Sequence, residues 1–232
     1  MTITLNGTTG ITSTVITETS GGNVGIGTSL PNEKLTVVAS TGGTGGIRVE
    51  TQYGAGYFGN YNNYPAMMYN SSGLKPVVVY DTNNHITSLH TDNTERMRID
   101  SAGRVTMPYQ PAFRAWGNAT TTGQVVKWNV VPLNIGGHYN SSTGRFTVPV
   151  NGTYLIILTI FVSVTGTTQL TARTSGGSIM ESKMNTNEGA YNSNSGSVLV
   201  YLSAGDYVEV NFDSGSVLNG PQFTYFAGYL IG

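Results

Sequence analysis

Hydrophobic and polar residues alternate along the C-terminal half of the chain with the two-residue period of a β-strand. The clearest case is 207–212, where Val208, Val210 and Phe212 fall on one face and the residues between them fall on the other. The tight-turn sequence at 204–206 leads into this segment. This pattern predicts a strand that buries one face in a core.

Short apolar segments recur along the chain and are separated by turns rich in Gly and Asn. Such spacing, about eight to twelve residues per segment, is typical of a β-sandwich or jelly roll. An apolar stripe with the 3.6-residue period of a helix never extends beyond two turns. The predicted fold class is therefore all-β.

The composition narrows the range of functions. Charged residues make up 10% of the 232 residues, against roughly 25% in an average globular protein, and 31 residues are Gly. Polar uncharged side chains must therefore keep the chain in solution, a bias shared with β-rich fibres and extracellular adhesive proteins. The net charge of −1 provides no basic field for nucleic acid or an anionic membrane.

The absence of cysteine limits how the fold is stabilised. With no Cys in the chain, disulfides, thiolate metal sites and a Cys nucleophile are excluded, so we expect packing and oligomerisation to supply the stability. Residues 1–20 lack the basic start and continuous apolar run of a signal peptide, and no apolar stretch is long enough to span a bilayer. We therefore expect release from the producing cell by a route such as lysis.

One motif identifies the C-terminal half more closely. Its spaced residues are Trp128, Asn134, Tyr139, Phe146, Gly152 and Tyr154. This spacing resembles the signature of the globular head of complement C1q, a trimeric jelly roll related to tumour necrosis factor. The segments 111–116, 198–208 and 223–232 resemble further strands of such heads in the same order. The departures are Trp128, where the family prefers Phe, and Ile156 and Leu158, where it prefers aromatic residues.

Two further segments resemble a different group of proteins. Residues 23–37 (NVGIGTSLPNEKLTV) and 95–108 (ERMRIDSAGRVTMP) are similar to paired segments of bacteriophage tail-fibre proteins. Each places a Gly turn before a short apolar strand that ends near a Pro, an arrangement that suits a trimeric shaft in which each chain contributes one β-layer. Between them, we expect a strand at 75–80 and a turn at 81–84.

These segments divide the chain into three parts. We predict a virion-attachment segment at 1–22, a fibre shaft and intermediate β-domain at 23–107, and a ten-stranded jelly-roll head at 108–232. For 38–94, a compact domain and a continuous shaft remain open alternatives.

The almost continuously apolar stretch 154–164 is the expected contact between copies of the chain. Such a run is typical of a strand buried on both faces. We expect one face to lie in the core and one at the trimer interface. The predicted interface residues are Tyr154, Ile156, Leu158 and Ile160.

The titratable residues do not indicate a catalytic or metal-binding site. The twelve acidic residues are scattered rather than paired as glycoside hydrolysis requires, and we expect Glu95 and Asp100, beside two arginines, to form ion pairs between chains. His85, His90 and His138 lack the spacing of metal ligands. The C1q resemblance implies calcium in some heads, but the nearest acids, Asp206 and Asp213, do not specify a site. No catalytic residue, metal or cofactor is predicted.

Recognition is expected in a polar loop of the head. The segment 183–195 is long, polar and carries one Tyr, which is typical of a recognition loop on a rigid sandwich. The alternative is a plain solvated connection. The predicted receptor-binding residues are Asn185, Asn187, Tyr191, Asn192 and Asn194. The Tyr-rich stretch 53–69 is either a second contact surface or the packing of a slender β-domain.

Together the resemblances imply a homotrimeric phage tail-fibre protein that binds the host surface. Its expected partners are other virion proteins, through the N-terminus, and a host glycan or protein. It is expected to be made in the host cytoplasm and to act on the virion. One alternative is a purely structural virion component, such as a head fibre or baseplate protein. Another is a polysaccharide-degrading enzyme.

Overall fold

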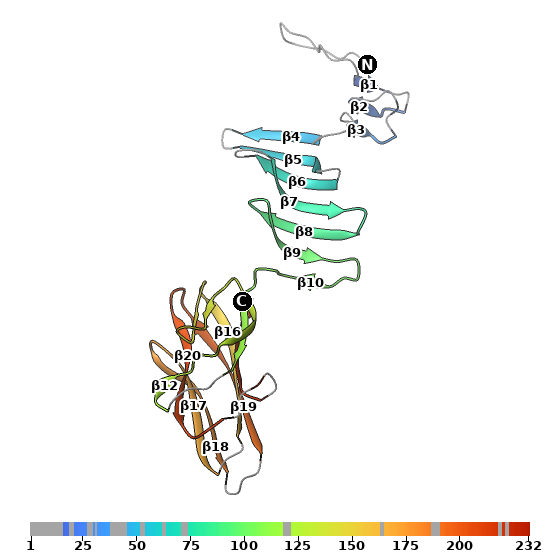
Figure 1. Ribbon diagram of the computed structural model, residues 1–232. Coiled ribbons are helices and arrows are strands. Elements are labelled where there is room, and N and C mark those ends of the chain that lie inside the picture. Colours follow the sequence, from blue (N-terminus) through green and yellow to red (C-terminus); the bar gives the residue numbers. More distant parts are fainter. Residues whose placement is uncertain are drawn as a thin grey trace. The chain divides into compact units, whose positions relative to one another are not determined.

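The computed structural model is built of β-strands and divides into two units, Met1–Pro108 and Tyr109–Gly232 (Figure 1). The part of the chain that it describes contains no helix, and therefore no helix that could cross a membrane. The all-β class predicted from the period-two pattern is confirmed. The structure describes residues 16–18, 21–26, 30, 32–37, 46–51, 54–61, 64–70, 74–117, 122–162, 165–186, 191–217, 220 and 223–232.

The first unit begins with a small sheet of three short strands. They are β1 (Ile16–Glu18), β2 (Val24–Ile26) and β3 (Leu35–Val37). β2 pairs antiparallel with β1 and parallel with β3. Most of the predicted attachment segment 1–22 lies outside the described residues.

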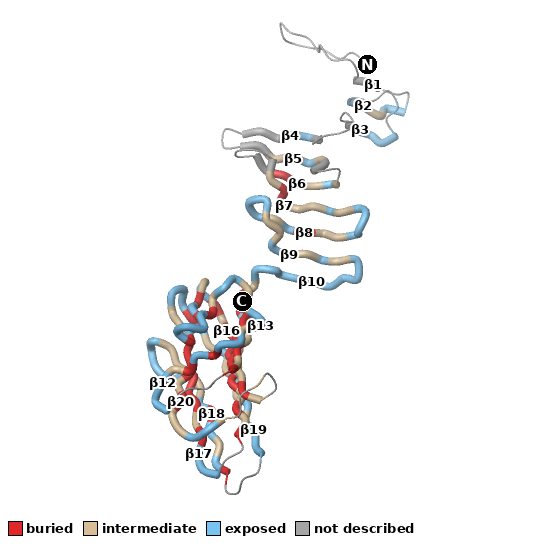
Figure 2. Tube along the Cα trace, viewed as in Figure 1, coloured by how far each residue is buried: buried red, intermediate tan, exposed pale blue. Residues whose placement is uncertain are grey.

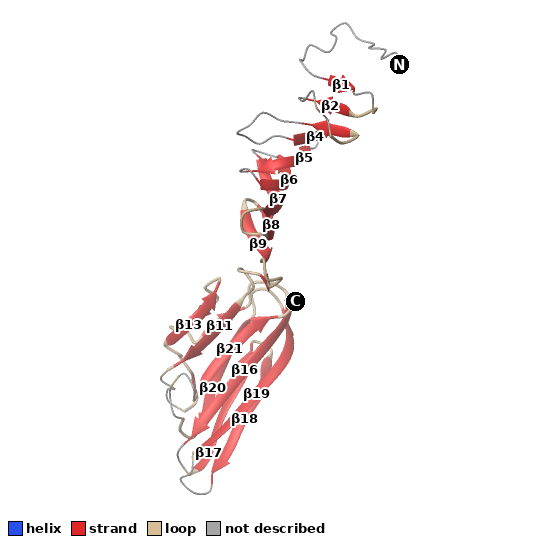
Figure 3. Ribbon diagram, turned by 90° about the vertical axis from the view of Figure 1, so that its right-hand side faces the viewer, coloured by secondary structure: helices blue, strands red, loops and turns tan. Residues whose placement is uncertain are grey.

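A second sheet of the first unit contains seven strands, each hydrogen-bonded to the next in sequence. It is an antiparallel meander that forms a single layer (Figure 3). Its strands are β4 (Gly46–Thr51), β5 (Gly54–Tyr61), β6 (Tyr64–Asn70), β7 (Leu74–Asp81), β8 (Ile86–Thr91), β9 (Thr94–Ile99) and β10 (Val105–Thr106).

Turn residues fix the connections of this meander. The expected strand at 75–80 lies in β7, and the expected turn follows it, where Asp81 Oδ1 accepts hydrogen bonds from the backbone N–H groups of Asn83 (2.9 Å) and Asn84 (3.1 Å). In the next turn, Asp100 accepts from the backbone N–H and the guanidinium of Arg104, and these bonds lower the pKa of its carboxyl group. Gly103 provides the positive φ of +79° that this turn requires.

The two acids that were expected to form ion pairs between chains instead pair with arginines of their own chain. Glu95 pairs with Arg98 at 2.7 Å and Asp100 pairs with Arg104 at 2.7 Å, both within one chain. A bulge between Leu89 and His90 brings Glu95 onto the same face as Arg98, which the plain alternation of the sequence does not indicate.

The second unit is a sandwich of two antiparallel sheets (Figure 1). One sheet has five strands in the order β13-β11-β21-β16-β19, namely β13 (Val130–Ile135), β11 (Ala112–Trp116), β21 (Tyr225–Leu230), β16 (Gly152–Val162) and β19 (Asn192–Leu202). The other has six, namely β14 (Tyr139–Asn140), β15 (Arg145–Thr147), β20 (Tyr207–Ser214), β17 (Gly166–Thr174), β18 (Gly177–Thr186) and β12 (Gln124–Val125), which pairs with β20. The two-residue strands β12 and β14 take the described head above the predicted ten strands.

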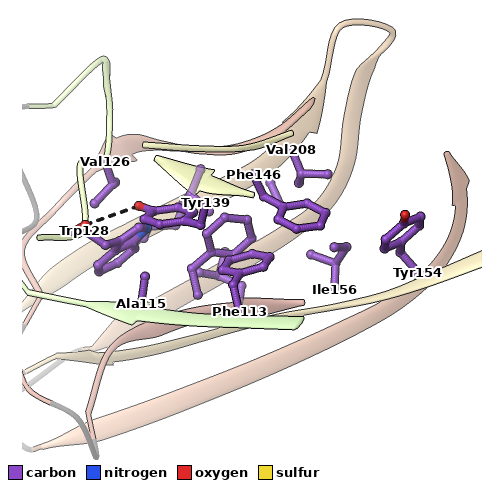
Figure 4. Packing of buried hydrophobic residues seen from close by; sticks show 14 of the residues in the cluster. Phe113, Ala115, Val126, Trp128, Tyr139, Phe146, Tyr154, Ile156 and Val208 are labelled. Carbon is purple, nitrogen blue, oxygen red and sulfur yellow. Dashed lines mark hydrogen bonds between the residues drawn. The ribbon is translucent and has the colours of Figure 1, made fainter. Parts of the chain in front are cut away.

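Buried residues are concentrated between the two sheets (Figure 2). Phe113 lies in the middle of an aromatic cluster, stacked on Tyr139 (centroids 5.2 Å apart) and Phe146 (4.6 Å) and edge-on to Phe226 (4.8 Å). Figure 4 shows these rings packed against Trp128, Ile156 and neighbouring aliphatic residues. Offset and edge-on aromatic pairs add to the stabilisation that burial alone provides.

The motif residues each have a structural task in this sandwich. The side-chain amide of Asn134 bonds both backbone groups of Tyr139, accepting from its N–H (3.0 Å) and donating to its carbonyl (2.9 Å). At Gly152 a Cβ would lie 2.7 Å from Leu230 Cδ1 and 3.0 Å from the Gly232 carbonyl oxygen, so a larger residue would require the C-terminal end of the chain to shift. The Tyr154 hydroxyl donates to the Val150 carbonyl at 2.8 Å. The sequence motif is therefore a set of packing and turn requirements.

The buried Tyr139 hydroxyl makes the head lose stability at alkaline pH. Burial raises the pKa of Tyr139 well above 10, and the hydrogen bond to the Trp128 carbonyl only partly opposes this. Stability is therefore complete below pH about 10, where the unfolded phenol also keeps its proton, and is lost as pH rises toward the raised pKa of the folded state. We expect Tyr139→Phe to reduce this alkaline loss.

Thermal unfolding between about pH 7 and pH 11 measures the effect, which arises because the unfolded tyrosine ionises first. At neutral pH the substitution should cost about 1 kcal/mol or less, because the hydrogen bond that it removes is long, at 3.4 Å. An unchanged slope of stability against pH in Tyr139→Phe would show that Tyr139 is not the group responsible.

Candidate functional site

Strand β16 buries every second residue, and this alternation decides which side chains can meet another molecule. Tyr154, Ile156, Leu158 and Ile160 are 0% exposed and point into the sandwich. They present no surface to a neighbouring chain, so the interface prediction selected the inward face of the strand. The residues between them, including Leu155 and Ile157, point outward and are only half-buried.

The outward side chains of the five-stranded sheet form a largely apolar surface, here called the outer apolar face. Direct cross-strand partners extend it over three strands, because Leu155 pairs with Tyr229 on β21 and with Leu199 on β19. Leu199 is 62% exposed and Tyr201 is 67% exposed, which is high for large apolar side chains. The outer apolar face comprises Leu133, Leu155, Ile157, Leu199, Tyr201 and Tyr229, together with Trp116 and Tyr225.

One cation lies on this face among aromatic rings. The Arg114 guanidinium lies 4.6 Å from the centroid of the Tyr225 ring and 5.3 Å from that of Trp116. Cation–π contacts of this kind hold the guanidinium against the aromatic rings, and a guanidinium is more weakly hydrated than an ammonium group. The positive charge therefore does not prevent another apolar surface from approaching.

The outer side of the six-stranded sheet has the opposite character. Glu209 on β20 is 3% exposed because two arginines cover its carboxylate, Arg145 from β15 (2.7 Å) and Arg173 from β17 (2.9 Å). Arg145 also lies 4.0 Å from the centroid of the Tyr207 ring, and Asp213 accepts from Thr171 and Asn211. Polar groups that are already paired in this way suit a surface that faces water.

Most of the predicted receptor residues lie at the end of β18 and the start of β19. Asn185 is exposed on the outer side of β18, and Asn192 is exposed at the start of β19. The side chain of Asn194 donates to the Lys183 carbonyl (3.1 Å), which gives it a structural role in joining β19 to β18. Asn187 lies outside the described residues. The receptor role of this set therefore stays a prediction.

Tyr191, one of the predicted receptor residues, belongs to an aromatic group that the sequence analysis did not identify. It is 71% exposed, and its ring stacks on Phe161 with centroids 6.0 Å apart. Phe161 in turn contacts Phe223 at 5.0 Å. We call Phe161, Tyr191 and Phe223 the distal aromatic cluster, because they lie near the last residue of β16, whereas the chain enters the head beside its first.

The length of β16 separates the two ends of the head. At its first residues, the Thr153 N–H donates to the Gly232 carbonyl, and the Leu230 N–H donates to Pro111 close by. Its eleven residues span roughly 33 Å at about 3.3 Å per residue. The distal aromatic cluster is therefore far from the point where the first unit is attached. The outward parity of Phe161 in the apolar run was the one signal that pointed to it.

The histidines and acids are mostly held in local hydrogen bonds. Tyr80 bonds His85 Nδ1 at 3.1 Å, and Ser88 bonds His90 Nε2 at 2.8 Å. Asp206 accepts from the Ser203 N–H within its own turn (3.1 Å). His138 lies edge-on to Phe146. Within the described ranges, no three His, Asp or Glu side chains are grouped so that they could hold a metal ion.

The comparisons with known proteins concern the second unit. Residues 112–231 match the family described as C1q domain. Similar solved structures include the globular domain of zebrafish complement 1qA, which is 20% identical with a TM-score of 0.45 over 53% of this chain and 98% of that chain. Eiger TNF from S. frugiperda is 16% identical with a TM-score of 0.46, over 53% of this chain and 93% of its own. Murine APRIL at pH 5.0 is 17% identical with a TM-score of 0.44, over 53% of this chain and 99% of its own.

Replacing an isoleucine of β16 by aspartate should have different effects on the inward and the outward face of the strand. Ile160→Asp places a carboxylate in the core, where an unpaired charge costs several kcal/mol, a large part of the roughly 5–15 kcal/mol that stabilises a typical domain. We expect this variant to unfold the head. Ile157→Asp places the same charge on the outer apolar face and should leave the head folded while weakening its self-association.

Circular dichroism reports folding of the two variants and light scattering reports their mass. A folded Ile157→Asp variant with the mass of the unmodified protein would show that the outer apolar face is not a contact between chains. A folded Ile160→Asp variant would contradict the placement of β16.

Proposed function

The chain belongs to the C1q domain family through residues 112–231, and we propose that it is a homotrimeric adhesion protein of a bacteriophage tail fibre, with heads that bind the host surface. The observation that carries this proposal is the asymmetry of the head. One sheet has an outer face of exposed aliphatic and aromatic side chains, whereas the other has paired charges. A surface of the first kind needs a partner, and one of the second kind does not.

Copies of the same head are the partner that fits the outer apolar face. C1q and tumour-necrosis-factor-like domains form homotrimers. In a threefold arrangement each chain can present the same apolar face toward a common axis. The low charge of the chain supports this arrangement, because few ions would have to lose water when the faces meet.

The assignment to a tail fibre is supported by the first half of the chain. Segments 23–37 and 95–108 resemble paired tail-fibre segments and include strands β2, β3, β9 and β10. A single-layer meander in the same chain as the head, with much Gly and few charges, has the topology and composition expected of a fibre. The N-terminal residues are then the part available for attachment to other virion proteins.

Host binding is proposed for the far end of the head. The distal aromatic cluster lies at the end of β16 away from the chain entry and has a Tyr ring that is largely exposed. A rigid aromatic ring among Asn and Ser residues offers a large contact area together with adaptable hydrogen bonds. Three heads on one fibre, and several fibres on one particle, would convert weak single contacts into firm capture.

Binding without catalysis is the mode of action that the family and the site favour. C1q-like domains are generally binding or structural modules rather than enzymes. A polysaccharide-cleaving enzyme would need two carboxylates available for catalysis. Three of the acids of this chain, Glu95, Asp100 and Glu209, are instead paired with arginines. The function proposed is therefore adhesion.

Binding of the labelled protein to cells tests this proposal directly. We expect fluorescent full-length protein to label susceptible bacteria and Tyr191→Ala to weaken the binding per head by about tenfold or more, because exposed aromatic anchors dominate such contacts. Tyr109→Ala is the matched control, since Tyr109 is 55% exposed at the chain-entry end of the head.

The mass of each variant must be measured alongside, so that a lost trimer is not mistaken for a lost receptor contact. Absence of labelling by a confirmed trimer, over a panel of hosts, would favour a purely structural role on the virion. Equal binding by Tyr191→Ala and Tyr109→Ala would place the receptor site elsewhere.

A further inference from the structure

The seven-stranded sheet of the first unit has one apolar side chain at the same position on six successive strands. Each of these residues is the direct ladder partner of the next, from β4 to β9. Direct partners in an antiparallel ladder point to the same face, so the side chains form a continuous line. This line, here called the apolar stripe, consists of Ile47, Phe58, Met67, Val78, Leu89 and Met97.

The apolar stripe is open to solvent in the single chain. Phe58 is 53% exposed, Met67 is 45% exposed and Leu89 is 42% exposed. A second row on the same face runs beside it through Tyr80, Thr87, Ile99 and Val105. Of these, Val105 is 52% exposed and extends the apolar face to β10. Within the described residues, this face of the sheet therefore leaves a line of large apolar side chains exposed.

The opposite face of the sheet has a different composition. The row of ladder partners next to the apolar stripe consists of Gly59, Ala66, Val79, Ser88, Arg98 and Thr106. Apart from Val79, its residues are small or polar. Ser88 is only 7% exposed and bonds His90 (2.8 Å), and Arg98 is held by two hydrogen bonds to Glu95 (2.7 and 2.8 Å). Polar groups of this row thus have partners in the same chain, whereas the described side chains of the apolar stripe remain exposed.

We infer that the apolar stripe is an interface that packs against the same stripe on two further copies of the chain. The inference rests on the trimer of the proposed function. A partner must offer an apolar surface as long as six strands and without charges opposite the stripe. The same sheet of another copy meets both requirements. Each head is joined to one such sheet through the peptide bond between Pro108 and Tyr109, so three associated heads tether three such sheets and raise their local concentration.

The absence of cysteine makes this interface testable with single engineered thiols. Val78→Cys puts a thiol on the apolar stripe, and Val79→Cys puts the same change on the opposite face, one residue away on β7. We expect the full-length Val78→Cys protein to form a disulfide under a mild oxidant, joining two chains and leaving the third thiol of each trimer free. A trifunctional maleimide should join all three chains. Val79→Cys should give neither product.

Light scattering on the same samples separates failure of this inference from failure of the proposed trimer. A confirmed trimer with Val78→Cys thiols that stay unlinked would overturn the stripe as an interface and leave the head trimer in place. Equal linkage of Val78→Cys and Val79→Cys would also overturn it, because the contact would not be specific to one face. A monomeric protein would instead remove the trimer itself.

A second pair of variants repeats the cross-linking test on another strand, in case a variant of the first pair does not fold. Leu89→Cys lies on the stripe and Ser88→Cys on the opposite face, on the neighbouring strand β8. Linkage confined to Leu89→Cys is the expected result. Both pairs must agree for the assignment to stand, and circular dichroism confirms that each variant retains its β-structure.

Discussion

Among the described residues, two faces of large apolar side chains stay exposed in the single chain, and the proposed assembly depends on how these faces are buried. The five-stranded sheet of the head and the seven-stranded sheet of the first unit each expose a face of large apolar side chains. Only 10% of the residues are charged, so electrostatic repulsion does little to keep such faces apart. Association through both faces removes them from water and leaves the paired, polar faces outside.

Strand β16 shows how one sequence can satisfy two environments. Its even-numbered residues fill the core of the sandwich, and its odd-numbered residues contribute to the outer apolar face. Core packing and association are therefore specified by the same eleven residues, and a shift of register by one residue would exchange the two sets. The ladder partners on β19 and β21 fix that register over the full length of the strand.

Local chemistry made part of this structure predictable from the sequence. Alternation at 207–212 gave β20 its correct faces, and the roles of Asn134 and Gly152 follow from a side-chain bond and a close backbone approach. The interface prediction selected the wrong face of β16, although Thr153 and Thr159, the polar residues of this strand, both fall on its outward face. Glu209 does point outward, yet Arg145 and Arg173 from two other strands bury it. Contacts between distant segments, such as Phe161 with Phe223, depend on registers that the sequence does not display.

The mass of the intact protein in solution tests the central claim most directly, because the proposal gives both apolar faces a partner of the same sequence. Native mass spectrometry of the full-length protein should give three times the chain mass of 24.6 kDa, and the same species should persist on dilution. A protein that stays at the mass of one chain while its β-structure is intact would contradict the account, since both faces would then be stable in water.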